Sequence, residues 1–307
     1  MLISIFKSNQ RIVNAFTGIV AIALWLVAFY RKEGDFLLDN KWLDMLVTVT
    51  LITLQAVWMN RIVNNHKLIE RTTYLTSLCY VAMASTAFFS LSFHLILIAN
   101  TFIIAAFWYL LHLYNLKDKL HLIFNASLLI GIAVLFYHPY VVFLPFVWFV
   151  VIYISSSVWR DFIISLIGFA LPLVYLAAYY FIFNDLHTLN WTVDASAALE
   201  PAAFAMSLKT LLIVLGGLLL VAFYVLLQMM SRSIVRVRRL LWMVLVMGVL
   251  MAATFMLNGN NLALTLASLV LPVSVVMAAF FERLSRTWLA ESLFLLFLAN
   301  LIWVYFS

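Results

Sequence analysis

The stretch "LFYHPYVVFLPFVWFVV", residues 135–151, decides how the middle of this chain folds. It sets two prolines and one histidine among aliphatic and aromatic side chains. The apolar run around it, 120–158, is about twice as long as the twenty residues that one membrane-spanning helix needs. The run therefore predicts two helices that meet at His138 and Pro139. Proline suits the first turn of the second helix, because its missing N–H would have no partner there.

The basic residues support this interpretation independently. If the chain crosses a membrane at each apolar run, the N-terminus and the even-numbered connections hold fourteen of the eighteen Lys and Arg residues. The odd-numbered connections hold the other four: Arg31, Lys32, Lys41 and Lys209. A single helix over 120–158 would move Arg160 to the opposite side and break this alternation. The positive-inside rule then predicts a cytoplasmic N-terminus and an external C-terminus.

The composition places the chain in a membrane. Apolar residues make up 67% of the 307 residues and charged residues only 10%, against roughly half and a quarter in soluble domains. The predicted fold class is all-α, a polytopic transmembrane bundle forming a single domain, 1–307. We expect eleven spans: 12–30, 42–59, 72–92, 95–114, 120–137, 139–158, 162–183, 208–230, 240–257, 262–281 and 288–306. The first is expected to be a retained span, because its apolar core exceeds that of a signal peptide.

The charge distribution argues against nucleic acid as a partner, and the cysteine content excludes an intrachain disulfide and a cysteine-zinc site. The net charge of +6 is dispersed between apolar runs, so we expect a lipid bilayer and no nucleic acid as partner. Anionic lipids and other membrane proteins of the cell envelope are the further partners we consider. The single Cys79 rules out an intrachain disulfide and a cysteine zinc site. No cofactor is expected.

The first external loop carries Asp35 and Asp39, four residues apart. Acids at this place could serve a lipid-linked-glycan transferase as a base or as metal ligands. The alternative, which we favour, is that both acids are simply solvated.

The histidines do not predict a metal centre. His94, His138 and His187 are expected at the external face and the other three at the cytoplasmic face, about 30 Å away. No pair has a metal-binding spacing within a span. A three-histidine external site is the alternative to separate interfacial residues. We interpret His138 as a turn residue, and Pro145 predicts no more than a local kink.

The densest basic patch is "SRSIVRVRR", which contains four arginines. They are Arg232, Arg236, Arg238 and Arg239. Topological anchoring explains their position, and binding of lipid phosphate is the sharper alternative. Glu291 is the one acid clearly inside an expected span, which makes it a functional candidate. It is a weak one, because it lies within about a turn of the predicted cytoplasmic interface. Pro172 and Pro272 lie at mid-span and would suggest a transporter if they broke their helices.

Three places in the sequence resemble an uncharacterised family of multi-spanning inner-membrane proteins of Bacteroidota, a domain of unknown function. They are the start "MLISIFKSNQ", the turn "LFYHPYVVF" and the connection "WRDF". The resemblance implies an inner-membrane protein of this length with no established reaction. Such proteins sometimes carry a beta-carotene monooxygenase label, which the scattered histidines argue against.

We therefore expect an integral inner-membrane protein that acts as a scaffold or assembly component of the cell envelope. A lipid-linked-glycan transferase and a small-molecule or lipid transporter are the two alternatives. Whether the chain is an enzyme stays open at this point.

Overall fold

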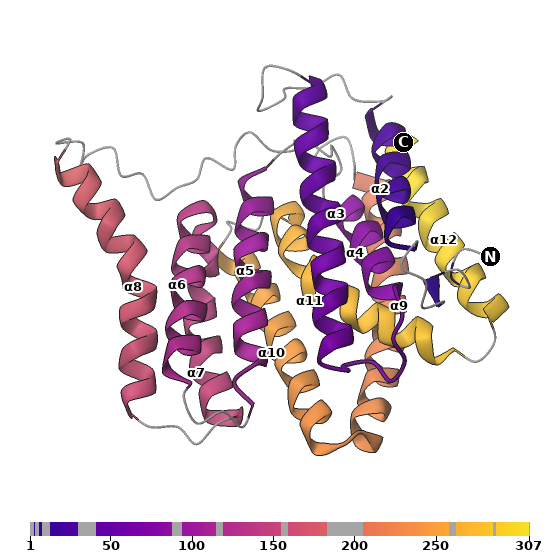
Figure 1. Ribbon diagram of the computed structural model, residues 1–307. Helices are drawn as coiled ribbons and strands as arrows, with labels where there is room; N and C mark the ends of the chain where they lie inside the picture. Colours follow the sequence, from indigo (N-terminus) through magenta and orange to yellow (C-terminus); the bar gives the residue numbers. More distant parts are fainter. Residues whose placement is uncertain are drawn as a thin grey trace. The chain divides into compact units, whose positions relative to one another are not determined.

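The computed structural model describes residues 3, 6–7, 13–29, 41–87, 94–114, 119–154, 159–182, 205–257, 262–284 and 287–306. Within these residues the chain is all-α, which confirms the predicted class (Figure 1). The α-helices are α2 (Val13–Phe29), α3 (Lys41–Asn65), α4 (Leu75–Ala87), α5 (Leu95–Leu111), α6 (Leu120–Phe136), α7 (Phe143–Ile154), α8 (Trp159–Ile182), α9 (Ala205–Arg232), α10 (Val235–Leu257), α11 (Leu262–Arg283) and α12 (Thr287–Phe306).

Each of the eleven expected segments coincides with one of these helices. Among the described residues, six helices are long and apolar enough to cross a bilayer. They are α3 and the five helices from α8 to α12. Nearly all of the α11 segment is buried, whereas the other five are buried over less than half of their length, as expected of helices that face lipid. The remaining helices are apolar but shorter, so the number of spans and their orientation stay predictions.

The predicted turn at His138 and Pro139 is confirmed. Helix α6 ends at Phe136, and a 3-10 helix, η1 (His138–Val142), carries Pro139 in its first turn before α7 begins. Pro145 is the third residue of α7, where a backbone N–H has no acceptor within the helix, so proline is tolerated there. The local kink at Pro145 stays a prediction.

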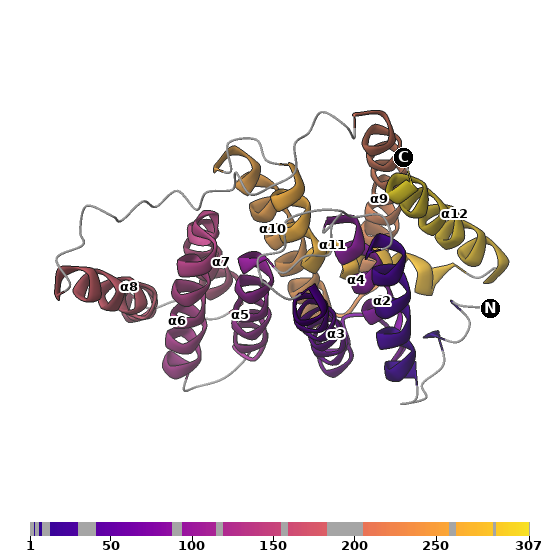
Figure 2. The ribbon, with the colours of Figure 1, turned by 90° about the horizontal axis from the view of Figure 1, so that it is seen from above.

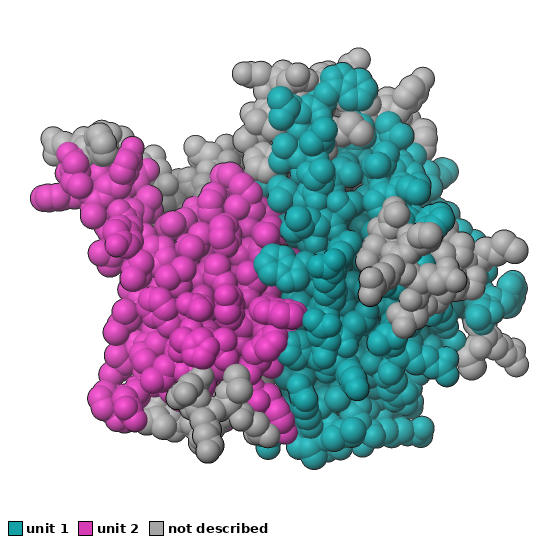
Figure 3. All heavy atoms as spheres, in the orientation of Figure 1, with its two compact units in different colours: residues 1–94, 200–244, 269–307 teal, residues 95–199, 245–268 magenta. Residues whose placement is uncertain are grey.

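The chain divides into two compact units, coloured separately in Figure 3. Unit 1 comprises Met1–His94, Glu200–Val244 and Leu269–Ser307, and unit 2 comprises Leu95–Leu199 and Leu245–Ser268. Whether the whole chain acts as one membrane domain stays a prediction.

In unit 2, α6 packs between α5 and α8, as both ribbon views show (Figures 1 and 2). Glycines let α6 and α8 approach closely. A Cβ at Gly131 would lie 2.5 Å from the Phe169 carbonyl oxygen, and one at Gly168 would lie 2.7 Å from that of Phe124. Small residues at a helix interface are the usual route to close packing in membranes, where water does not drive helices together.

Amides inside the helices make the hydrogen bonds expected of polar groups in an apolar medium. In unit 2, the Tyr140 hydroxyl donates to Asn100 Oδ1, and Asn100 Nδ2 donates to the Ala267 carbonyl at 3.0 Å. In unit 1, the Tyr80 hydroxyl donates to Gln55 Oε1 at 2.7 Å and joins α4 to α3. Each bond satisfies groups that lipid could not.

The two mid-span prolines do not break their helices. Helix α8 continues through Pro172 and α11 through Pro272. Pro172 packs against α6, and its Cγ would lie 3.1 Å from a Cβ at Gly131. The helix breaks on which a transporter interpretation rested are therefore absent from these two helices.

Candidate functional site

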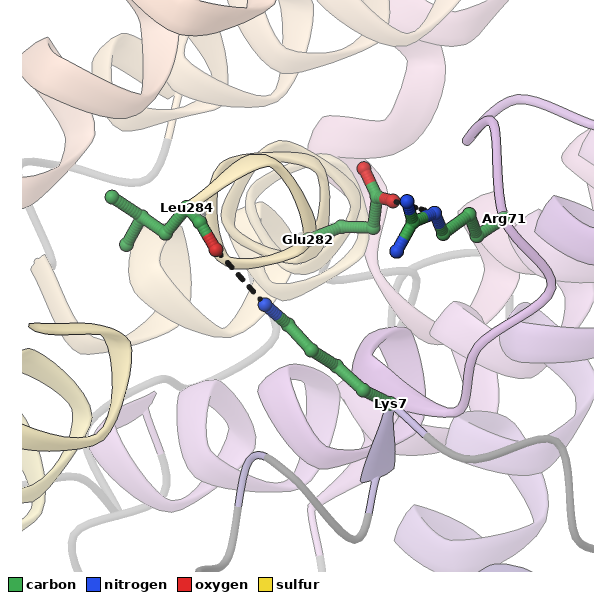
Figure 4. A network of polar contacts seen from close by, with 4 residues as sticks. All are labelled: Lys7, Arg71, Glu282 and Leu284. Atoms are coloured by element: carbon green, nitrogen blue, oxygen red, sulfur yellow. Dashed lines mark hydrogen bonds and ion pairs between the residues drawn. The ribbon is translucent and has the colours of Figure 1, made fainter. Parts of the chain in front are cut away.

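One end of unit 1 gathers charged side chains from the N-terminal segment, α11 and the connection that follows α3. The N-terminal segment is held there by burial of Ile3 and Phe6 and by a backbone hydrogen bond from the Tyr74 N–H to the Phe6 carbonyl, 2.9 Å long. Lys7 Nζ then donates to the Leu284 carbonyl at 3.1 Å (Figure 4). A cation at this place satisfies a carbonyl beyond the C-terminus of α11, where the helix dipole favours positive charge.

Glu282, the next-to-last residue of α11, points to the other side of the same helix end (Figure 4). Its Oε1 lies 3.7 Å from Nε of Arg71, and the glutamate side chain is only 9% exposed whereas the arginine is 84% exposed. Burial lowers the pKa of the Lys7 ammonium, and the negative charge of Glu282 opposes part of that effect. The Glu282 carboxylate therefore already interacts with two basic side chains, those of Arg71 and Lys7.

A pocket of about 260 Å³ opens beside this network, between the ends of α9 and α11. Its polar lining consists of Arg232 and Gln228 from α9 and Arg283 from α11. Leu284, whose carbonyl holds Lys7, is also part of the wall. Arg283 reaches the Val225 carbonyl at a long 3.5 Å. The described residues that line the pocket include no acid, and its polar groups, two guanidinium groups and an amide, are donors that suit an anion.

The arginines of "SRSIVRVRR" have different surroundings. Arg238 folds back over the end of α9: its Nε donates to the Met230 carbonyl at 2.9 Å, and its NH2 group lies 3.3 Å from the carbonyls of Ser231 and Ser233. It caps the C-terminus of α9. Arg232 lines the pocket, whereas Arg236 and Arg239 do not.

The structure adds two pocket residues that the sequence interpretation did not select, Arg283 and Gln228. Arg283 could have been found, because it ends an apolar run on the same predicted side as the arginine patch. Gln228 precedes Arg232 by one helical turn, a spacing that places both on one face of α9.

Several predicted candidates lie elsewhere. Asp35, Asp39 and His187 lie outside the described residues. Glu291 is half-buried on α12, and His94 is half-buried just before α5, where burial lowers its pKa. No cluster of three metal-binding side chains occurs in the described part of the chain.

Asp44 is a buried acid that the sequence interpretation did not select as a candidate. It lies in the first turn of α3 and is 0% exposed, with Thr48 fully buried one turn later. The N-terminus of a helix stabilises a carboxylate, which accounts for the acid at this position.

Among the described residues, the helices long and apolar enough to cross a bilayer are those of an all-α membrane protein. Within that class, residues 1–307 match the family described as "Family of unknown function (DUF6427)" over the whole length, and the chain belongs to this family. Searches of curated proteins and of solved structures each return no match for it.

Proposed function

We propose that this protein is an integral protein of the inner membrane that serves the cell envelope as a scaffold or assembly component and binds a phosphate-bearing lipid headgroup at the pocket between α9 and α11. The observation that carries the proposal is the convergence of Arg232 and Arg283 on one acid-free cavity. Guanidinium groups match phosphate oxygens in a two-pronged geometry, so a pair of them selects phosphate over neutral headgroups.

Topological anchoring alone would account for basic residues on this side of the membrane, but not for their convergence. Arg232 ends α9 and Arg283 ends α11, so two separate helices contribute to one wall. Under the predicted topology, both helix ends face the cytoplasm, where the leaflet carries anionic lipids. A headgroup seated there would fix the protein to the leaflet without a chemical reaction.

Native mass spectrometry of the full-length protein with phosphatidylglycerol tests the proposal. The double variant R232Q/R283Q should weaken binding by about a hundredfold or more, because each guanidinium loses a charge-assisted hydrogen bond to the phosphate that contributes about 1.5–3 kcal/mol. The control R236Q/R239Q removes the same charge from positions outside the pocket lining and should bind almost as the natural protein does. An equal loss of phosphatidylglycerol binding in both double variants would indicate that the arginines only anchor the protein through their charge, and it would refute the headgroup site.

The scaffold role is tested separately by affinity purification from membranes. A scaffold should copurify with other envelope proteins, and a protein recovered alone under mild detergent would contradict that role without affecting the lipid measurement. The lipid-linked-glycan transferase remains the alternative that uses the same pocket, since a lipid diphosphate presents the same chemistry. It additionally needs Asp35 or Asp39, so loss of envelope function in D35N/D39N would favour it.

A further inference from the structure

A second cavity of unit 1 lies on α2 and α3, away from the arginine pocket. It is a groove of about 810 Å³. Its lining residues are Thr17, Gly18, Thr50, Thr53, Leu54, Val57, Trp58 and Arg61. The groove shares no lining residue with the pocket between α9 and α11.

The wall of the groove behaves as an apolar surface despite its threonines. The Thr50 hydroxyl donates to the Leu46 carbonyl at 2.6 Å, and the Thr53 hydroxyl donates to the Val49 carbonyl at 2.9 Å. Both hydroxyl protons are therefore used within α3, and the methyl groups remain to contact an occupant. Such a surface suits a hydrocarbon chain.

Gly18 keeps the groove open on the side of α2. A Cβ built there would have only one neighbour, Thr53 Cγ2 at 4.0 Å. A larger side chain at this position would point into open space and would fill the groove without displacing backbone.

The length of the groove matches half of a membrane. From Thr50 to Arg61 it follows α3 for about 16 Å, at a rise of 1.5 Å per residue. This is about half of the roughly 30 Å hydrocarbon thickness, that is, one leaflet. Thr50 lies toward the middle of α3, and Arg61 lies one turn before its end at Asn65.

Arg61 supplies a positive charge where a lipid headgroup would lie. Its side chain is exposed, and the described residues that line the groove include no acid. An apolar groove one leaflet long that ends at a guanidinium is complementary to an acyl chain that ends at a phosphate.

We propose that the groove binds one membrane phospholipid with an anionic headgroup, its acyl chain along α3 and its phosphate on Arg61. A second copy of the chain is the competing occupant. A two-fold dimer through this face would place the two Arg61 side chains at the same depth and close together, where like charges repel. An anionic phospholipid is attracted by the Arg61 charge and not repelled by it. The groove proposal does not depend on the arginine pocket, because separate variants test the two sites.

Photo-crosslinking locates the lipid directly. The probes are phosphatidylglycerol and phosphatidylcholine with a photoreactive group in the acyl chain, used on the full-length protein in bilayer nanodiscs. The α3 peptide that contains Leu54 and Trp58 should be labelled about fivefold more by the anionic probe, the preference expected from one arginine near the surface. The R61Q variant should lose this preference while keeping the acyl contact.

A groove-filling variant tests the cavity itself. G18L should lower labelling of the α3 peptide by both probes, whereas G217L, on a stretch of α9 where a Cβ meets no atom within 4 Å, should leave it unchanged. Equal labelling by the two probes in the natural protein, or a preference that survives R61Q, would overturn the proposal. So would disulfide-linked dimers of an L54C variant, because the native Cys79 is buried and the new thiol would then face a second copy.

Discussion

Lys119 and Asp161 form a buried ion pair, with 2.8 Å between Nζ and Oδ2. Lys119 directly precedes α6 and Asp161 lies in the first turn of α8, so the pair joins the starts of two helices that run side by side. The side chains are only 11% and 2% exposed. The acid of the "WRDF" connection thus holds the same two helices that Gly131 and Gly168 bring into contact.

We expect D161N to destabilise the protein by about 3–5 kcal/mol, because it leaves a buried ammonium without its counter-ion. The measurement is the free energy of unfolding in mixed micelles. The double variant K119M/D161L removes both charges and should cost much less than either single change. If D161N unfolds like the natural protein, the pair contributes nothing to stability.

Larger residues at the glycines of α6 and α8 should separate the two helices. We expect G131V or G168V to cost about 1–3 kcal/mol or more, because each added side chain meets a backbone carbonyl that cannot move aside. Thermal unfolding in detergent measures the loss. G216A on α9, where no atom lies within 4 Å of a Cβ, is the matched control and should unfold at an unchanged or slightly higher temperature.

The buried hydrogen bond between Tyr140 and Asn100 holds the turn at His138 against α5. We expect Y140F to lower the free energy of unfolding by about 1–3 kcal/mol, because it leaves the side-chain amide oxygen of Asn100 without a donor in an apolar interior. N100L also removes the donor to the Ala267 carbonyl and should cost more than Y140F, but adding Y140F to N100L should cost little further, because the hydroxyl has then already lost its acceptor. An equal cost of Y140F in both backgrounds would indicate that the hydroxyl stabilises the fold in another way.

Arg238 and Arg239 are neighbours in sequence with different contacts. R238Q should lower the free energy of unfolding by about 1 kcal/mol or more, since three carbonyls at the end of α9 lose their donors. R239Q, for which no such contact is described, should change it by less than about 0.5 kcal/mol. Hydrogen exchange at the end of α9 provides a local readout. Equal exchange rates in both variants would contradict the capping role.

The helical segments could be predicted from sequence because they depend on local composition. Each expected apolar segment is a helix, and the turn at Pro139 follows from the length of the run and from the chemistry of proline. Helix ends differ by several residues at α3 and α8, because the polar residues at those ends continue the backbone hydrogen bonds.

The arrangement of polar side chains could not be predicted in the same way. Asp44 lies near the start of one expected span and Asp161 in the predicted connection before another, and both proved buried. Arg238 became a helix cap and Arg232 a pocket residue, although they belong to one basic patch.

The sequence by itself determined the all-α class and the alternation of charge, because a lipid solvent requires apolar helices and the positive-inside rule distributes basic residues between them. Only the tertiary structure decided which polar groups meet: Arg232 with Arg283 at one pocket, Lys119 with Asp161 between two helix starts. The physical reason is that such pairs depend on which helices pack together, and packing depends on the shape of side chains far apart in sequence, such as Gly131 against Pro172.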